Sequence, residues 1–378
     1  RPQYGHSDDR GSTSVMKRSN ENNEVSMAIR KVTQRKCVYV IGAGFSAGLG
    51  YPLTGDLLFR LWKELGNLGE PDERLRTGLT KVIKFHHPGF DEKQFTTFPN
   101  VEELLSEMLV NEKLFRASRE YEGNFTLEEL RNLQRDLLLR IGTWFHDLSD
   151  KIDWTQTSGG WLHRFREKVL TENAALISFN WDLVLDRLLF GDDLGKNCYR
   201  LKSSNSGPVL LKPHGSLNWY EEELGRHISS DNRKEIFHGK NSNSVYAFLP
   251  YRSPRTKSER VYTPLIVPPV HLKEFDKPIF TSLWQDTVSV LSTAKKVVFL
   301  GYSMPPNDLH VQFIMRCGFY NQVEGMPTED GARTDKTGRA KVVIVNPDQS
   351  AARRIANAVG PAYRPEWISA PVSEWVEA

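Results

Sequence analysis

Three polar side chains that follow two apolar runs of the sequence are of types that occur in catalytic sites. Asn180 and Asp182 come after the run at 174–179, and His214 comes after the run at 209–212. A histidine near an asparagine, opposite a phosphate-binding turn, can act as the general base of a nucleotide site. Each also has a structural alternative, because Asn180 and Asp182 could form a turn or cap a helix and His214 could be a hydrogen-bonded turn residue.

A glycine-rich turn could supply the phosphate-binding element. The run Cys37 to Ile41 is apolar and β-branched, which predicts a buried parallel strand, and glycines follow it at 42, 44, 48 and 50. Glycine lets the backbone approach a ligand closely, and the N–H groups at a helix start favour a pyrophosphate. Ser46 adds a hydroxyl donor. The spacing departs by one residue from the dinucleotide fingerprint, so a turn that serves only packing is the alternative.

The elements that would position these residues form an alternating pattern. Further strands are predicted at 174–179, 209–212, 296–300 and 341–345, with helical segments between them. The last two strands end in Gly301-Tyr-Ser303 and Asn346, whose polar side chains could also cap helices. This alternation predicts an α/β protein with a Rossmann-like parallel sheet whose strand ends face one crevice. The polar segment 221–260 is predicted to be a loop or an exposed excursion.

A helical insertion is predicted after the first strand–helix unit. An enzyme of the dehydrogenase type would place an acidic residue about 20 positions after its glycines, at the end of a second strand, and none is found. Apolar residues instead recur at helical spacing within 101–115, 127–148 and 160–169. We therefore expect a flexible tail at 1–30, a domain over 31–378 and a helical insertion at 66–170. The apolar stripe from Leu127 to Phe145 is expected to form core or a subunit contact.

Composition excludes several classes of protein. The chain has 378 residues and a formal net charge of +3, which does not favour direct nucleic-acid binding. Its three separated cysteines, Cys37, Cys198 and Cys317, cannot form a four-thiolate zinc site or a disulfide framework, so we expect no metal and a reducing, cytoplasmic setting. The sequence contains no run of roughly 20 apolar residues and its start lacks the apolar core of a signal peptide.

Five motifs resemble, in order along the chain, the ligand-contacting motifs of the sirtuin superfamily. They are Gly42-Ala-Gly-Phe-Ser46, Ser178-Phe-Asn-Trp-Asp182, Pro213-His-Gly215, Gly301-Tyr-Ser303 and Val345-Asn-Pro-Asp348. The resemblance covers the α/β portion and leaves out the tail and the helical insertion. It implies a sirtuin-like fold that binds NAD.

The resemblance also implies a role for each matching residue. Asn180 would orient the nicotinamide ribose or an attacking water, Asp182 would lie near the carboxamide pocket, and His214 would be the general base. The residues implied in binding the pyrophosphate and the adenosine half of NAD are Gly42, Ala43, Gly44, Ser46, Gly301, Ser303 and Asn346.

Two departures from the sirtuin pattern bear on the reaction. Sirtuin deacylases carry two cysteine pairs of a zinc module after the His-Gly motif, whereas residues 216–261 contain no cysteine. Their glycine loop continues into an Asp-Phe-Arg element, whereas this chain has Tyr51-Pro-Leu-Thr-Gly55. The chain thus resembles the zinc-free sirtuin-like proteins of prokaryotic antiviral defence, which cleave NAD.

The resemblance implies an NAD glycohydrolase that yields nicotinamide and ADP-ribose and depletes NAD in an anti-phage, abortive-infection response. It further implies a homo-oligomer, built through the helical insertion, and a HerA-type ATPase or another nucleic-acid-handling partner. Two alternatives stay open. One is a sirtuin-type deacylase or ADP-ribosyltransferase, and the other is a non-catalytic module that senses NAD or ADP-ribose.

Overall fold

A computed structural model of the chain describes the residues on which the following account rests. They are 35–66, 69–117, 125–154, 160–191, 193–194, 198–201, 207–221, 233–238, 244–248, 264–267, 277–306, 308–328 and 330–378. The predicted tail at 1–30 and much of the predicted loop at 221–260 lie outside these residues.

Six parallel strands form the central sheet, in the order β3-β2-β1-β7-β8-β9. Their bounds are β1 Cys37–Ile41, β2 Ala175–Ser178, β3 Val209–Leu211, β7 Lys296–Leu300, β8 Lys341–Val345 and β9 Glu366–Ile368. The chain begins in the middle of the sheet, winds outward to β3 and then returns to β7 on the other side of β1. This is the strand order of Rossmann folds, so the predicted α/β class is confirmed.

Strand register brings the carboxyl ends of the central strands level with one another. Ile41 of β1 pairs with Ser178 of β2 and with Leu300 of β7, and Leu300 pairs with Val345 of β8. The residues that follow these strands therefore start at one edge of the sheet. The edge strand β9 was not predicted, because its three residues are largely exposed and carry no apolar run.

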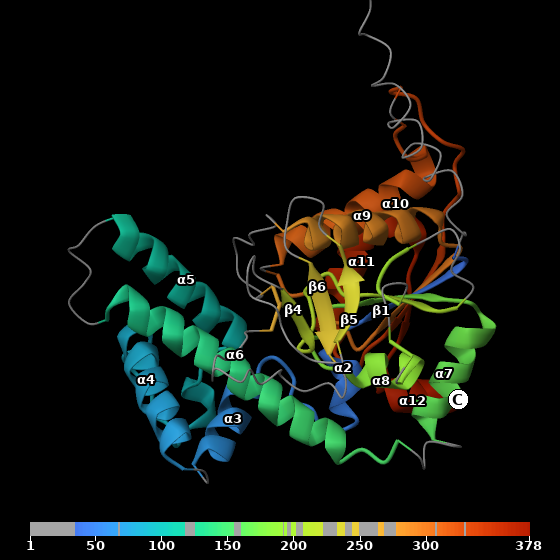
Figure 1. The fold of residues 1–378 in the computed structure, drawn as a ribbon. Coiled ribbons are helices and arrows are strands. Elements are labelled where there is room, and N and C mark those ends of the chain that lie inside the picture. The colour runs from blue at the N-terminus through green and yellow to red at the C-terminus, as the bar shows by residue number, and fades with distance from the viewer. Residues whose placement is uncertain are drawn as a thin grey trace, which may run out of the picture.

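Helices cover both faces of the sheet (Figure 1). One layer consists of α9 Pro278–Thr293, α10 Leu309–Glu324 and α11 Gln349–Val359. The other consists of α2 Ala43–Ala47, α7 Trp161–Thr171, α8 Val184–Phe190 and α12 Val372–Glu377. Because both faces are covered, the central strands are apolar at nearly every position, and β1 is buried along its whole length.

The remaining helices of the N-terminal half stand beside the sheet, at the left of Figure 1. They are α3 Leu57–Leu65, α4 Glu70–His86, the short 3-10 helix η1 Phe95–Thr97, α5 Val101–Ala117 and α6 Leu127–Asp150. Helix α6 begins with a capping box between Thr126 and Glu129. The predicted stripe on α6 packs inside the chain, since Leu130, Leu137 and Ile141 are at most 2% exposed. Of the two predicted uses, this part of the stripe serves as core, whereas Leu127 and Leu133 are half-buried.

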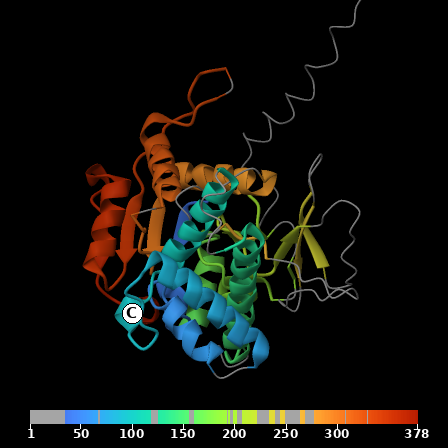
Figure 2. The ribbon, with the colours of Figure 1, turned by 90° about the vertical axis from the view of Figure 1, so that its left-hand side faces the viewer.

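A second, three-stranded antiparallel sheet follows β3. It consists of β4 Trp219–Glu221, β5 Arg233–Phe237 and β6 Val245–Phe248, in the order β4-β6-β5. In Figure 2 these yellow strands lie on the opposite side of the molecule from the red α11. The prediction of a loop over 221–260 was wrong at β5 and β6. The sequence of β5 is largely polar and so did not indicate a strand, but its main chain pairs with that of β6.

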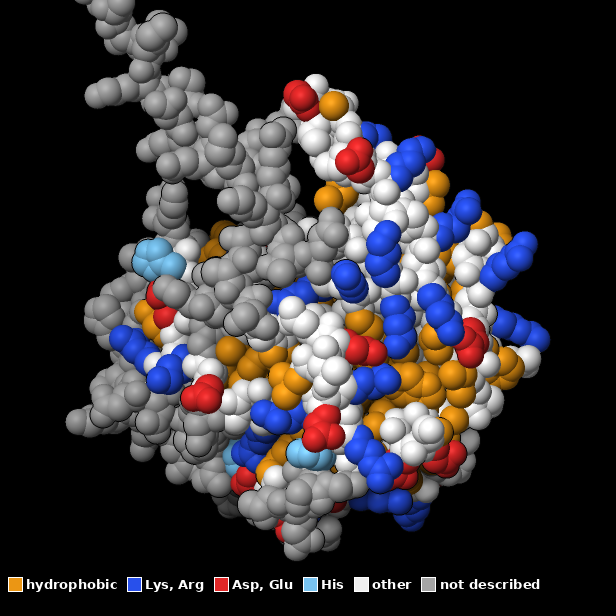
Figure 3. All heavy atoms as spheres, turned by 90° about the vertical axis from the view of Figure 1, so that its right-hand side faces the viewer, with side chains coloured by type: hydrophobic (Ala, Val, Ile, Leu, Met, Phe, Trp, Pro, Cys, Tyr) orange, Lys and Arg blue, Asp and Glu red, His pale blue; other side chains and the backbone are white. Residues whose placement is uncertain are grey.

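The surface fits the balanced composition of the chain. On the face shown in Figure 3, lysine and arginine side chains are spread among acidic and apolar ones. Among the helices of the described segments, none is long and apolar enough to cross a membrane.

The turn between β1 and α2 packs directly against the turn that follows β7. The Gly44 N–H donates to the Gly301 carbonyl at 2.9 Å. Gly301 has a φ of +58°, and a Cβ added to it would lie 2.4 Å from the carbonyl carbon of Gly44. A Cβ on Gly42 would lie 2.5 Å from the Cα of Tyr302. Backbone packing therefore requires glycine at these positions, whatever ligand the turn holds.

We expect Gly301→Ala to lower the free energy of unfolding by more than about 3 kcal/mol, because left-handed strain adds to a steric overlap with backbone. Gly331→Ala is the matched control, since Gly331 has a φ of +79° and nothing within 4 Å of an added Cβ. It should cost only the strain, about 1–2 kcal/mol. Urea denaturation measures both. If both variants lost the same free energy of unfolding, the turns after β1 and β7 would not be tightly packed against each other.

Candidate functional site

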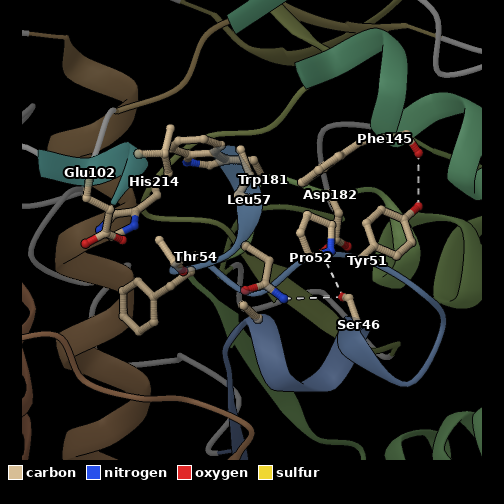
Figure 4. A pocket seen from close by; sticks show the side chains of 14 residues that line it. Ser46, Tyr51, Pro52, Thr54, Leu57, Glu102, Phe145, Trp181, Asp182 and His214 are labelled. Carbon is tan, nitrogen blue, oxygen red and sulfur yellow. Dashed lines mark hydrogen bonds between the residues drawn. The ribbon is translucent and has the colours of Figure 1, made fainter. Parts of the chain in front are cut away.

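A pocket opens at the carboxyl ends of β1, β2 and β3, beside the point where the winding of the sheet reverses (Figure 4). Open α/β sheets bind ligands at such a reversal. The turn after β1, the loops after β2 and β3, and helices α3, α5 and α6 contribute its walls. The lining residues are Ala43, Ser46, Tyr51, Pro52, Thr54, Leu57, Val101, Glu102, Phe145, Phe179, Asn180, Trp181, Asp182 and His214.

The structure brings together half of the residues that the sequence singled out. Ala43, Ser46, Asn180, Asp182 and His214 all line this pocket. The other predicted residues do not line it, and they are Gly42, Gly44, Gly301, Ser303 and Asn346. They lie at the same edge of the sheet, around the ends of β1, β7 and β8.

The predicted residues outside the pocket have structural contacts of their own. The side-chain amide of Asn346 donates to the Tyr302 carbonyl at 3.0 Å and so ties the end of β8 to the turn after β7. Ser303 is exposed, and its carbonyl accepts a hydrogen bond from Arg354.

A short chain of hydrogen bonds orients Asn180 relative to the glycine turn. Asn180 Nδ2 donates to the Gly42 carbonyl at 3.0 Å and lies 3.4 Å from Ser46 Oγ. Ser46 Oγ in turn donates to Asp182 Oδ2 at 2.7 Å (Figure 4, dashed lines). The turn after β1 and the loop after β2 are therefore joined through side chains that also face the pocket.

Asp182 is both a pocket residue and a structural one. Its second oxygen, Oδ1, accepts a hydrogen bond from the Val184 N–H at 3.0 Å, at the start of α8. Burial raises the pKa of the Asp182 carboxyl, while the nearby charge of Lys212 and the hydrogen bond from Ser46 oppose that shift. These bonds hold the carboxylate in place beside Asn180.

A buried lysine links the two loops that carry Asn180 and His214. Lys212 Nζ lies 2.7 Å from the Asp182 carbonyl, 2.7 Å from Ser216 Oγ and 2.9 Å from Asp186 Oδ2. The side chains of Lys212 and Asp186 are 1% and 0% exposed, and the Tyr199 hydroxyl donates to the other oxygen of Asp186. Lys212 was not among the predicted site residues, although a lysine at the end of an apolar strand is unusual unless its charge is paired.

His214 lies in an apolar wall of the pocket and is 5% exposed. Its ring centroid is 5.0 Å from that of Phe179 and 6.0 Å from that of Trp284. Its Nε2 atom lies 3.4 Å from Asp308 Oδ2. The sequence analysis did not single out Asp308, because in the sequence it is simply the first residue of a predicted helix.

One group of side chains in the described segments has the spacing of a metal site. The ligand atoms of His87, Glu103 and Glu107 all lie within 4.8 Å of one another. None of the three lines the pocket. His87 Nε2 and Glu107 Oε2 are 3.1 Å apart, so a hydrogen bond accounts for the approach of these two without a metal.

We expect Lys212→Met to lower the free energy of unfolding by about 3–5 kcal/mol, because it leaves the buried Asp186 charge without its partner. The double variant Lys212→Met, Asp186→Asn should recover about half of that loss or more. Lys341→Met is the control, since Lys341 pairs with Glu366 at 3.0 Å but is 67% exposed. It should cost less than about 1 kcal/mol. A double variant no more stable than the single one would contradict the pairing.

Comparison with known proteins returns sirtuins among solved structures. No protein-family model matches the chain, and no curated protein sequence matches it. A Sir2 homolog in complex with NAD is 13% identical, with 97% of this chain and 94% of that chain covered and a TM-score of 0.39. Sir2Tm bound to a propionylated peptide is also 13% identical, with 94% and 95% covered and a TM-score of 0.36. Scores this low do not by themselves establish a shared fold, so the Rossmann-like assignment rests on the strand order.

Proposed function

We propose that the protein is an NAD glycohydrolase, which cleaves NAD to nicotinamide and ADP-ribose. The observation that carries the proposal is the meeting of Asn180 and His214 in one pocket with Ala43 and Ser46 of the glycine turn. An amide, an imidazole and a phosphate-binding turn at the reversal point of a parallel sheet are the parts that a dinucleotide cleavage site needs. The five sirtuin-like sequence motifs support NAD as the dinucleotide.

The chemistry fits these side chains. The bond from the ribose to the cationic nicotinamide nitrogen has a good leaving group, so its cleavage does not need the acid of an ordinary glycosidase. Asn180 would hold the ribose or the attacking water, and His214 would accept the proton from that water. The carboxylates of Glu102 and Asp182 also line the pocket, and negative charge stabilises an oxocarbenium-like state.

The adenosine half of NAD would run from the glycine turn along the sheet edge towards Gly301 and Ser303. Asn346 would act there indirectly, because its amide is bonded to the Tyr302 carbonyl and orders the turn after β7. Binding energy from this remote half would hold the ribose over Asn180 and His214.

We further propose that this activity depletes NAD as the effector of an anti-phage system. The sequence supports it through the lack of cysteine in 216–261, where sirtuin deacylases hold the zinc module of their peptide groove. Unregulated NAD cleavage would harm the host, so we propose control by assembly, with copies of the chain or with a HerA-type ATPase. Because the α6 stripe is buried within the chain, such assembly would use another surface of the helical insertion.

Asn180→Ala and His214→Ala should each lower the rate of NAD cleavage by on the order of 10²–10⁴-fold, because each removes a group that acts on the reacting atoms. Product identification by mass spectrometry after incubation with NAD measures this, with and without a partner protein. His163→Ala is the control, since His163 pairs with Glu167 on α7 and does not line the pocket. It should keep the parental rate.

The products separate the proposal from its alternatives. Free ADP-ribose and nicotinamide support a glycohydrolase, whereas acyl-ADP-ribose or an ADP-ribosylated protein would identify a transferase or deacylase. NAD that binds but is never cut would identify a sensing module. Undiminished cleavage by both pocket variants would place the reaction elsewhere in the protein.

A further inference from the structure

Asp308, the N-cap residue of helix α10, contacts His214 in the wall of the pocket. Asp308 caps α10, where its Oδ1 accepts a hydrogen bond from the Val311 N–H at 3.2 Å. Its other oxygen, Oδ2, lies 3.4 Å from His214 Nε2, and both side chains are 6% exposed. One buried carboxylate therefore contacts both a helix start and the imidazole.

We propose that Asp308 is the positioning residue of His214, holding its imidazole in one orientation and stabilising the imidazolium that forms when His214 takes up a proton. The inference rests on the proposed role of His214 as the general base. A carboxylate that is held by a second bond orients a neighbouring histidine by accepting a hydrogen bond from its ring N–H. Its negative charge also stabilises the imidazolium. No proton needs to pass to Asp308 itself.

The surroundings of His214 make this carboxylate effective. Phe179 and Trp284 pack around the ring, whose side chain is only 6% exposed, so a neighbouring charge is weakly screened. Tyr302 contributes no charge, because burial and the carboxylates of Asp308 and Glu102 raise the pKa of its hydroxyl well above the usual value. Lys212 faces Asp186.

Two other carboxylates, those of Glu102 and Asp182, face the pocket and are alternative partners for His214. Glu102, from the start of α5, lies on the same side of the pocket as His214 in Figure 4. Asp182 lies on the other side, held by Ser46 and the Val184 N–H. Asp308 Oδ2 lies 3.4 Å from the imidazole and is held by a second bond to the start of α10, so we assign the role to Asp308.

The test is Asp308→Asn, followed by titration of His214. Asparagine also caps helices, so α10 should keep its start while the charge is lost. NMR of histidine-labelled protein, with the His214 signal assigned through His214→Gln, should show the pKa of His214 lowered by about 1 unit. In NAD cleavage, kcat should fall by about 10-fold or more with KM little changed, and the acid limb of the pH profile should move to lower pH.

Asp72→Asn is the matched control. Asp72 lies in the first turn of α4 and pairs with Arg140 at 3.1 Å, and it does not line the pocket. This variant should leave both the His214 titration and the rate unchanged.

An unchanged His214 titration in folded Asp308→Asn protein would overturn the inference. If the pKa of His214 were then lowered in Glu102→Gln, Glu102 would be the partner. The titration needs no turnover, so it decides the role of Asp308 even if the protein does not cleave NAD. Absence of cleavage in the parental protein would count against the proposed function alone.

Discussion

The close approach of two backbone turns in the middle of the sheet constrains the rest of the site. β1 and β7 are neighbouring strands whose carboxyl ends are level, and the backbone turns immediately after each of them, at Ile41 and at Leu300. The 2.9 Å bond from Gly44 to Gly301 leaves no space for a Cβ on either residue. This contact fixes where α2 begins and therefore where Ser46 lies. Through Ser46, it also fixes Asp182 and Asn180.

A second, polar constraint acts on the other side of the pocket. Lys212 is buried, and its ammonium group donates to the Asp186 carboxylate on α8, to the Asp182 carbonyl in the loop after β2 and to the Ser216 hydroxyl in the loop after β3. Ion pairs of this kind add little net stability, but losing one partner is costly. Their value here lies in geometry, because the Asp182 carbonyl and the turn that follows His214 are held by the same ammonium group.

Much of the fold and part of the site could be predicted from the sequence. The runs at β1, β7 and β8 are long and apolar, and the rule that parallel strands end at one edge was enough to bring Asn180 and His214 together. The strands β5 and β9 gave no periodic signal, because they are short and most of their side chains are polar or exposed. Asp308, Glu102 and Lys212 were missed because their importance depends on contacts between segments far apart in the chain. Packing requires glycine at 42, 44 and 301, which agrees with the packing turn that the sequence left open as an alternative to a phosphate-binding one.

The pocket has walls from two parts of the molecule. Val101 and Glu102 come from the start of α5 and Phe145 comes from α6, while Asn180 and His214 come from loops of the sheet. The width of the pocket therefore depends on how α5 and α6 pack against the sheet. A partner that pulled or pushed on these helices would widen or close the entrance mechanically, without touching any residue at the strand ends. The packing of α5 and α6 against the sheet would then control access to the site.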